Sequence, residues 1–145
     1  MSSILIARSK FWYNGWMKNT SRVGNLTVAK LLVALAEKGK VVLTPFGEGE
    51  RYDLMIDEGK KVLRVQCKTG KLKKGCILFN NYSQTGAGTK FYGTSVDAYG
   101  VYCPQNGKMY LVPASDCVSY KTSLRVEPTK NGRTKNIRFA KEYEL

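Results

Sequence analysis

The chain has 145 residues, with 24 Lys or Arg, 11 Asp or Glu and no His, which gives a net charge of +13. No apolar run approaches the length of a membrane-spanning helix, and the absence of histidine excludes His-ligated zinc and Ser-His or Cys-His catalysis. Ordinary small domains carry a net charge of about 2–8. The excess favours a polyanionic partner, above all nucleic acid, over a surface that serves solubility alone.

The cysteines are scattered without a CxxC pair, so neither a zinc site nor a disulfide framework is expected. They are Cys67, Cys76, Cys103 and Cys117. The opening residues, MSSILIARSK, contain no apolar stretch behind a basic one, which argues against a secretory signal. We therefore expect a cytoplasmic protein with reduced thiols, folded as a single domain over residues 1–145 with no membrane partner.

Along the chain, residues 1–19 are expected to form an aromatic and basic arm. Its Trp12 and Trp16 are expected in the core or at a subunit contact rather than against bases. A helix is expected from Thr20 or Ser21 to about Lys38, ending at a glycine. Its apolar residues occupy so many faces that it is expected to be largely buried.

Six strands are predicted from runs of apolar, β-branched and aromatic residues. They are expected at 40–46, 52–57, 62–68, 75–81, 98–104 and 108–114. A glycine- and serine-rich loop is expected over 82–95, and the last two strands form a hairpin about Gln105-Asn106-Gly107. A short helical turn capped by Ser115 or Asp116 ends the core at 20–118, and a basic segment over 119–145 shows weak strand signals.

The hairpin YDLMIDEGKKVLRVQCKTG, residues 52–70, carries polar side chains on strands that otherwise have the pattern of a core. Side chains alternate between the two faces of a strand. A tight turn near residues 58–59 would therefore bring Asp53 opposite Gln66, with Lys68 on the same face. This face would hold a carboxylate, an amide oxygen and an ammonium group close together.

Those three groups suit metal-assisted hydrolysis of a phosphodiester. Asp53 would anchor Mg²⁺, for which Mn²⁺ is expected to substitute, and neutral oxygens from the Gln66 amide and the Cys67 backbone carbonyl would complete the protein ligands. Lys68 would orient or deprotonate the attacking water and stabilise charge on phosphorus. The simpler interpretation, a solvated polar strand face, stays open on these three residues alone.

Basic residues adjoin this hairpin and are the predicted DNA-binding set. They are Lys60, Lys61, Arg64, Lys71, Lys73 and Lys74. A second basic cluster lies between residues 121 and 141. The expected partner is DNA, either duplex or branched.

The stretch TPFGEGERYDLMIDEGKKVLRVQCKTGKLKKG, with GTSVDAYGVYCP and YLVPASD after it, resembles the core of PD-(D/E)XK nucleases. It is most similar to archaeal Holliday-junction resolvase-like enzymes and group I intron homing endonucleases. The resemblance covers about residues 21–113 and implies an α/β fold with an αβββαβ core, in which helices flank a central mixed sheet. It also implies Mg²⁺ dependence and a homodimer or homotetramer. By this resemblance Asp53 is the metal-bridging aspartate, Gln66 the second ligand and Lys68 the motif lysine.

One position departs from the family pattern. Relatives usually carry a glutamate on the first helix, in a stretch like G-[DN]-L-T-E, whereas GNLTVAK places Val28 there. Valine cannot ligate a metal. Glu48 or Glu50, in the loop before Asp53, could supply a carboxylate instead. Three readings follow: a metal-dependent DNA endonuclease of junction-resolving or homing type, a weakened or inactive DNA-binding protein of the same fold, or a nucleic-acid-binding protein unrelated to nucleases.

Overall fold

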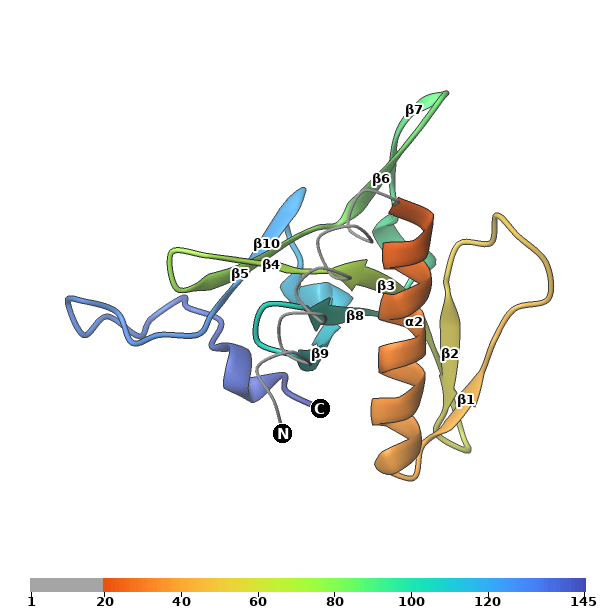
Figure 1. Ribbon diagram of the computed structural model, residues 1–145, viewed down its shortest axis with the longest axis horizontal. Helices are drawn as coiled ribbons and strands as arrows, with labels where there is room; N and C mark the ends of the chain where they lie inside the picture. Colours follow the sequence, from red (N-terminus) through yellow and green to blue (C-terminus); the bar gives the residue numbers. More distant parts are fainter. Residues whose placement is uncertain (1–19) are drawn as a thin grey trace, which may run out of the picture.

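The computed structural model describes residues 20–145, so the expected roles of Trp12 and Trp16 lie outside the described residues. A long helix lies against a five-stranded sheet, and two smaller sheets extend from it (Figure 1). No helix in the described part is long and apolar enough to cross a membrane. The elements of the helix and central sheet are α2 (Thr20–Glu37), β1 (Val41–Leu43), β2 (Leu54–Asp57), β3 (Val62–Thr69), β8 (Ala98–Cys103) and β9 (Lys108–Pro113).

The central sheet has the strand order β1-β2-β3-β8-β9, in which β3 and β8 are parallel and all other neighbours are antiparallel. This confirms the expected α/β fold with a central mixed sheet. The connection from β3 to β8 consists of strands and the 3₁₀ turn η1 (Gly93–Ser95). Within residues 20–145 the second helix of the αβββαβ pattern is therefore replaced by β structure.

Helix α2 packs against β3, β8, β1 and β9 through one face. Its buried residues are Thr27, Leu31, Ala34 and Leu35, a spacing that places all four on one stripe of a helix with 3.6 residues per turn. The expectation that the helix is largely buried is wrong, because Val33 on the far side is 57% exposed. The described residues cover α2 from the sheet side only.

The opposite face of the central sheet packs on a second hydrophobic cluster. Tyr99 and Val101 of β8 meet Ile77 and Phe79 from β5 and Leu124 from β10. These strands belong to a three-stranded sheet of order β10-β5-β4. Its elements are β4 (Lys71–Lys73), β5 (Cys76–Asn80) and β10 (Lys121–Arg125).

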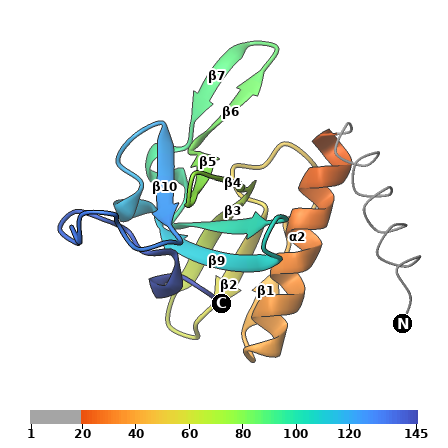
Figure 2. The same cartoon turned by 60° about the vertical axis from the view of Figure 1, so that its left-hand side comes forward.

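The expected loop over 82–95 is mostly a hairpin of β6 (Tyr82–Thr85) and β7 (Gly88–Phe91). This two-stranded ribbon projects away from the rest of the chain in both views (Figures 1 and 2). Its residues from 84 to 91 are exposed, so neither face has an apolar pattern from which strands could be predicted. The last elements are the 3₁₀ turns η2 (Ala114–Asp116) and η3 (Ala140–Glu142).

The free edge of β9 is covered by the C-terminal residues. The Leu111 N–H donates to the Tyr143 carbonyl at 2.8 Å, and the Leu145 N–H donates to the Met109 carbonyl at 2.9 Å. Residues 143–145 therefore satisfy backbone groups that an edge strand leaves open.

A substitution at Gly70 tests how tightly the two sheets are joined. Gly70 lies between β3 and β4, and a Cβ atom there would lie 2.6 Å from Ile77 Cγ2 and 2.9 Å from Val101 Cγ1. Both neighbours are fully buried β-branched residues, so Gly70→Ala should lower the free energy of unfolding by about 1–3 kcal/mol. Urea denaturation measures the loss.

Gly86→Ala is the matched control, because no atom lies within 4 Å of a Cβ placed there. Its stability should stay within about 0.5 kcal/mol of the parent chain. Equal stabilities for the two variants would contradict the close packing at Gly70.

Candidate active site

Asp53, Gln66 and Lys68 lie on the face of the central sheet that points away from α2. Val65 of β3 packs against Leu31 and Leu35 of the helix, so its neighbour Gln66 points to the other side. Leu54 pairs with Val65, which places Asp53 opposite Gln66, one residue further along. The register predicted from side-chain alternation is therefore the one in the structure.

The Asp53 carboxylate is held by two donors that both reach Oδ2. Gln66 Nε2 donates at 2.6 Å, and the Cys67 backbone N–H donates at 2.8 Å. Among residues 20–145 no donor reaches Oδ1. Burial raises the pKa of Asp53 above its ordinary value, and this outweighs the lowering by the Cys67 N–H, by the charge of Lys68 and by the Gln66 amide.

The Gln66 side chain has one atom without a partner. Gln66 is 9% exposed, and its Oε1 is buried and accepts no hydrogen bond from residues 20–145. Such an orphaned acceptor costs about 1–3 kcal/mol and calls for an explanation. A carboxylate and an unpaired amide oxygen side by side fit an oxygen-loving cation such as Mg²⁺.

This site has few acidic groups. In the described part of the chain, no three His, Cys, Asp or Glu side chains converge on one point. Glu48 and Glu50 are exposed in the loop before β2, where Gly47 and Gly49 adopt positive φ angles. Glu48, Glu50 and Asp53 therefore do not form a three-carboxylate cluster in the described part of the chain.

Lys68 is held at the start of the β6–β7 ribbon. Its Nζ donates to the Tyr82 carbonyl at 2.9 Å and to the Tyr92 hydroxyl at 3.4 Å. The same atom lies 4.6 Å from the centroid of the Tyr92 ring. Burial lowers the pKa of the Lys68 ammonium group, while the charge of Asp53 opposes that shift. Tyr92 was missed by sequence reasoning, because it falls in a glycine-rich stretch interpreted as a loop.

Cys67 contributes its backbone to the site and its side chain to the core. The thiol packs with the α2 cluster, and burial raises its pKa, so it stays protonated and unreactive at neutral pH. The Cys67 N–H orients Asp53. Its carbonyl as a metal ligand stays a prediction.

The structure separates the predicted DNA-binding residues. Lys60 and Lys61 lie at the β2–β3 turn, about 23 Å from Lys68 at the rise of an extended strand. Arg64 is engaged by Asp97 through Nε and Nη2 at 3.0 and 3.1 Å, and this guanidinium lowers the pKa of Asp97.

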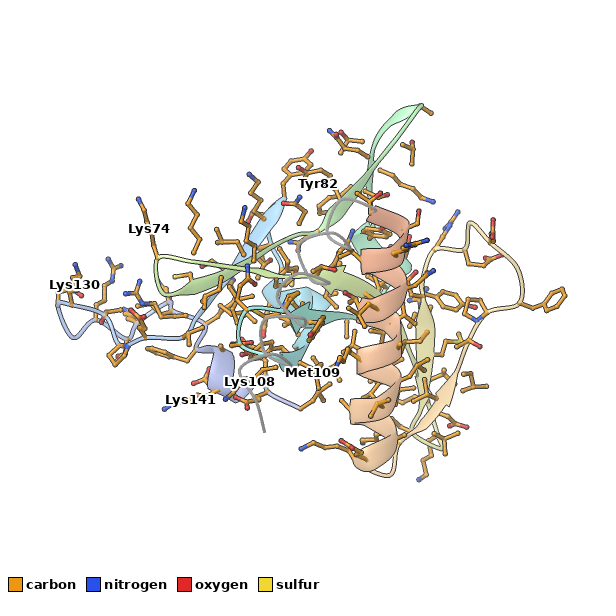
Figure 3. All side chains as sticks on the ribbon, in the orientation of Figure 1. Lys74, Tyr82, Lys108, Met109, Lys130 and Lys141 are labelled. Atoms are coloured by element: carbon orange, nitrogen blue, oxygen red, sulfur yellow. The ribbon has the colours of Figure 1, made fainter. Side chains whose placement is uncertain are left out.

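The remaining lysines of the set, Lys71, Lys73 and Lys74, are exposed on β4 and its turn. Lys74 extends from the tip of this turn (Figure 3). These three side chains are therefore open to a partner, in contrast to Arg64.

The position of Val28 follows from its neighbours on α2. Lys30 Nζ lies 5.9 Å from the centroid of the Tyr102 ring on β8, and Thr27 shares a 2.6 Å hydroxyl hydrogen bond with Thr69 on β3. Residues 28 and 30 lie about 200° apart around a helix. Because β8 and β2 flank β3 on opposite sides, half-buried Val28 lies on the flank of α2 toward β2, whereas the Asp53 side chain lies on the sheet face that points away from α2.

Two comparisons with known proteins found endonucleases. A family model described as PD-(D/E)XK endonuclease matches residues 18–145. A solved structure titled "The structure of a bacterial homing endonuclease: I-Ssp6803I" is similar with a TM-score of 0.67 and 18% identity, over 87% of this chain and 88% of that one. No curated protein sequence matches the chain. The family match confirms the resemblance predicted from the sequence and extends it into the basic C-terminal segment, while the structural likeness at this identity concerns the fold.

The raised pKa of Asp53 predicts a pH-dependent cost of folding. The folded carboxyl binds its proton more tightly than the unfolded one, whose pKa is 3.8, so the free energy of unfolding falls as pH rises from 3.8 to the folded pKa. Asp53→Asn keeps an oxygen for the two donors and removes the charge. In EDTA the free energy of unfolding of this variant should match that of the parent chain below pH 3.8. It should exceed that of the parent chain above the folded pKa of Asp53.

Urea denaturation in EDTA from about pH 3 to about pH 7 measures both curves. A variant that is less stable than the parent chain at neutral pH would show that the hydrogen bonds of the carboxylate outweigh the cost of its burial.

Proposed function

The chain belongs to the PD-(D/E)XK endonuclease family, and on that premise we propose that it is a metal-dependent DNA endonuclease with Asp53, Gln66 and Lys68 as its catalytic residues. The observation that carries the proposal is the buried, partnerless Gln66 Oε1 next to a carboxylate that Gln66 itself holds. A merely structural hydrogen-bonded pair would leave no reason to bury an unsatisfied oxygen.

Asp53 and the Gln66 amide oxygen are the side chains that would hold Mg²⁺ or Mn²⁺, with the Cys67 carbonyl as a third proposed ligand. All three are oxygen donors, the class that hard divalent cations prefer. When bound, such an ion supplies polarisation of the scissile phosphate and a lowered pKa for water.

Lys68 has two roles open to it beside a phosphate. Its ammonium uses donors toward Tyr82 and Tyr92, and an ammonium group has three, so one remains for a phosphate oxygen. The lowered pKa makes the neutral amine more accessible than in an exposed lysine, and that form can accept a proton from the attacking water. The contacts to Tyr82 and Tyr92 hold Nζ in place for either role.

We propose DNA as the substrate because of the net charge of +13 and the family. A homodimer or homotetramer is the proposed assembly, since one site cleaves one strand and cutting both strands needs a second site.

Replacing the proposed metal-anchoring carboxylate tests the function directly. Asp53→Asn should reduce nicking of supercoiled plasmid in Mg²⁺ by more than about 100-fold, and EDTA should abolish nicking by the parent chain. DNA binding should be retained, because a negative charge facing phosphate is removed.

Asp57→Asn is the matched control, with the same chemical change at the exposed end of the same strand. Asp57 Oδ1 accepts a hydrogen bond from the Gly59 N–H at 2.7 Å, and asparagine can keep it. Equal nicking rates for the two variants would remove Asp53 from the site.

The second candidate, a weakened nuclease or an inactive DNA-binding protein, is favoured by Val28. Position 28 is that of the helix glutamate in the family pattern, so we propose that Val28→Glu adds a carboxylate to a site in which Asp53 is the acidic ligand. We expect faster nicking than the parent chain and lower stability in EDTA. Mg²⁺ should restore the stability, by about 2.7 kcal/mol at a concentration 100 times the dissociation constant.

Val33→Glu adds the same charge on the exposed face of α2, where Val33 is 57% exposed, and serves as the control. It should change neither nicking nor the effect of Mg²⁺ on the melting temperature. If Val28→Glu behaved like this control, Val28 would be an ordinary packing residue and its carboxylate would not reach the site.

A further inference from the structure

The β6–β7 ribbon, residues 82–91, is exposed along most of its length and forms a two-stranded sheet of its own. It stands out from the rest of the molecule, with Tyr82 at its base (Figure 3). A lone two-stranded hairpin is marginally stable in water. The packing of residues 84–91 therefore does not account for the ribbon.

The segments that form the ribbon and the strands beside it are rich in basic residues and contain no acidic residue of their own. Residues 59–96 contain eight Lys or Arg and no Asp or Glu, and residues 117–126 add Lys121 and Arg125, again without an acid. The strands β4, β5, β6, β7 and β10 all fall within these two segments. Such a field attracts a polyanion.

Three aromatic rings meet at the base of the ribbon. The Tyr120 ring lies 5.4 Å from Phe91 and 5.9 Å from Tyr82 between centroids, both edge-on. Tyr120 is 63% exposed and Phe91 is 47% exposed. Two of the rings, Tyr82 and Tyr120, line a hollow of about 630 Å³ together with Gln84, Thr89, Ser119 and Lys121. Exposed rings beside basic side chains are typical of surfaces that contact sugars and bases.

The ribbon is anchored at both ends on the proposed catalytic lysine. Tyr82 at the start of β6 accepts a hydrogen bond from Lys68 Nζ, and Tyr92, directly after β7, lies over the same atom. A duplex held along the ribbon would therefore pass the proposed active site.

We propose that the ribbon, together with Tyr120 and Lys121, is a groove-binding element for double-stranded DNA. Neighbouring strands lie about 4.8 Å apart, so a two-stranded ribbon fits the major groove of about 12 Å. Lys90 and Lys121 contact phosphates, and Phe91 and Tyr120 contact sugars and base edges. The relation to Lys68 rests on the proposed function, whereas DNA binding by the ribbon does not require cleavage.

The charge part of the proposal is tested by fluorescence anisotropy with a labelled duplex of about three helical turns, in EDTA and at several salt concentrations. The double variant Lys90→Ala/Lys121→Ala should bind more weakly, and the slope of log K against log salt should become shallower by about two units. Lys38→Ala/Lys40→Ala removes two charges from the exposed segment after α2, outside both basic clusters, and should leave the slope unchanged. Equal losses in the two double variants would overturn the proposal, because net charge alone would then account for binding.

The aromatic part is tested with Tyr120→Ala, which should weaken binding by at least about fivefold without changing the salt slope. Val118→Ala is the matched control, since Val118 is 80% exposed and precedes Tyr120 by two residues. Circular dichroism melting checks that both variants fold. Unchanged DNA affinity in Tyr120→Ala would overturn the assignment of this ring.

Sedimentation of the same variants without DNA separates a partner chain from DNA. A ribbon variant that changed the oligomeric state and left DNA binding intact would make the ribbon a subunit contact and overturn the proposal. If the parent chain cleaves DNA and the ribbon substitutions leave DNA affinity unchanged, the proposed role of the ribbon would be overturned and the proposed nuclease function would stand. If the ribbon variants lose DNA binding and the parent chain does not cleave DNA, the proposed DNA-binding role of the ribbon would be supported and the proposed nuclease function would be overturned.

Discussion

The site depends on a carboxylate that is kept in a place where burial disfavours its charge. Asp53 immediately precedes β2, and its Oδ2 accepts hydrogen bonds from a backbone N–H and a side-chain amide of β3. These two bonds fix the carboxylate to the neighbouring strand. Burial still raises its pKa, so the apo site stores a cost that a bound cation would relieve.

β2 and β3 contribute both to the core and to the site, because side chains alternate between the two faces of a strand. On one face Leu54 and Val65 pack against α2, and on the other Asp53 and Gln66 meet. Gly100 of the adjacent strand allows the helix to come close, since a Cβ there would lie 2.8 Å from Leu31 Cδ1. Helix α2 packs on one face of the sheet, and the Asp53–Gln66 pair lies on the other. The register of β2 and β3 is fixed because a slip by one residue would exchange the two faces.

Sequence reasoning succeeded where the pattern was local and failed where distant segments meet. The pairing of Asp53 with Gln66 followed from alternation and a tight turn. The engagement of Arg64 by Asp97 depends on the parallel pairing of β3 with β8, which no local pattern encodes. The ribbon was interpreted as a loop because its polar, exposed residues from 84 to 90 give no periodic signal. Tyr92, which is buried, was missed because it falls in a glycine-rich stretch.

Charge links the proposed site to its proposed substrate. With Val28 on the helix, Asp53 is the acidic side chain among the proposed ligands, and Mg²⁺ is usually held by one or two carboxylates together with substrate phosphates. An ion would thus bind weakly to the protein alone and more tightly once DNA supplies anionic oxygens. By linkage the ion then strengthens DNA binding by the same factor. The surrounding surface, without a carboxylate from residue 59 to 96, brings the phosphate close without opposing charge. Under this proposal a site without the helix carboxylate would hold the ion mainly in the protein–DNA complex, and the positive surface would contribute to metal binding by attracting the phosphates.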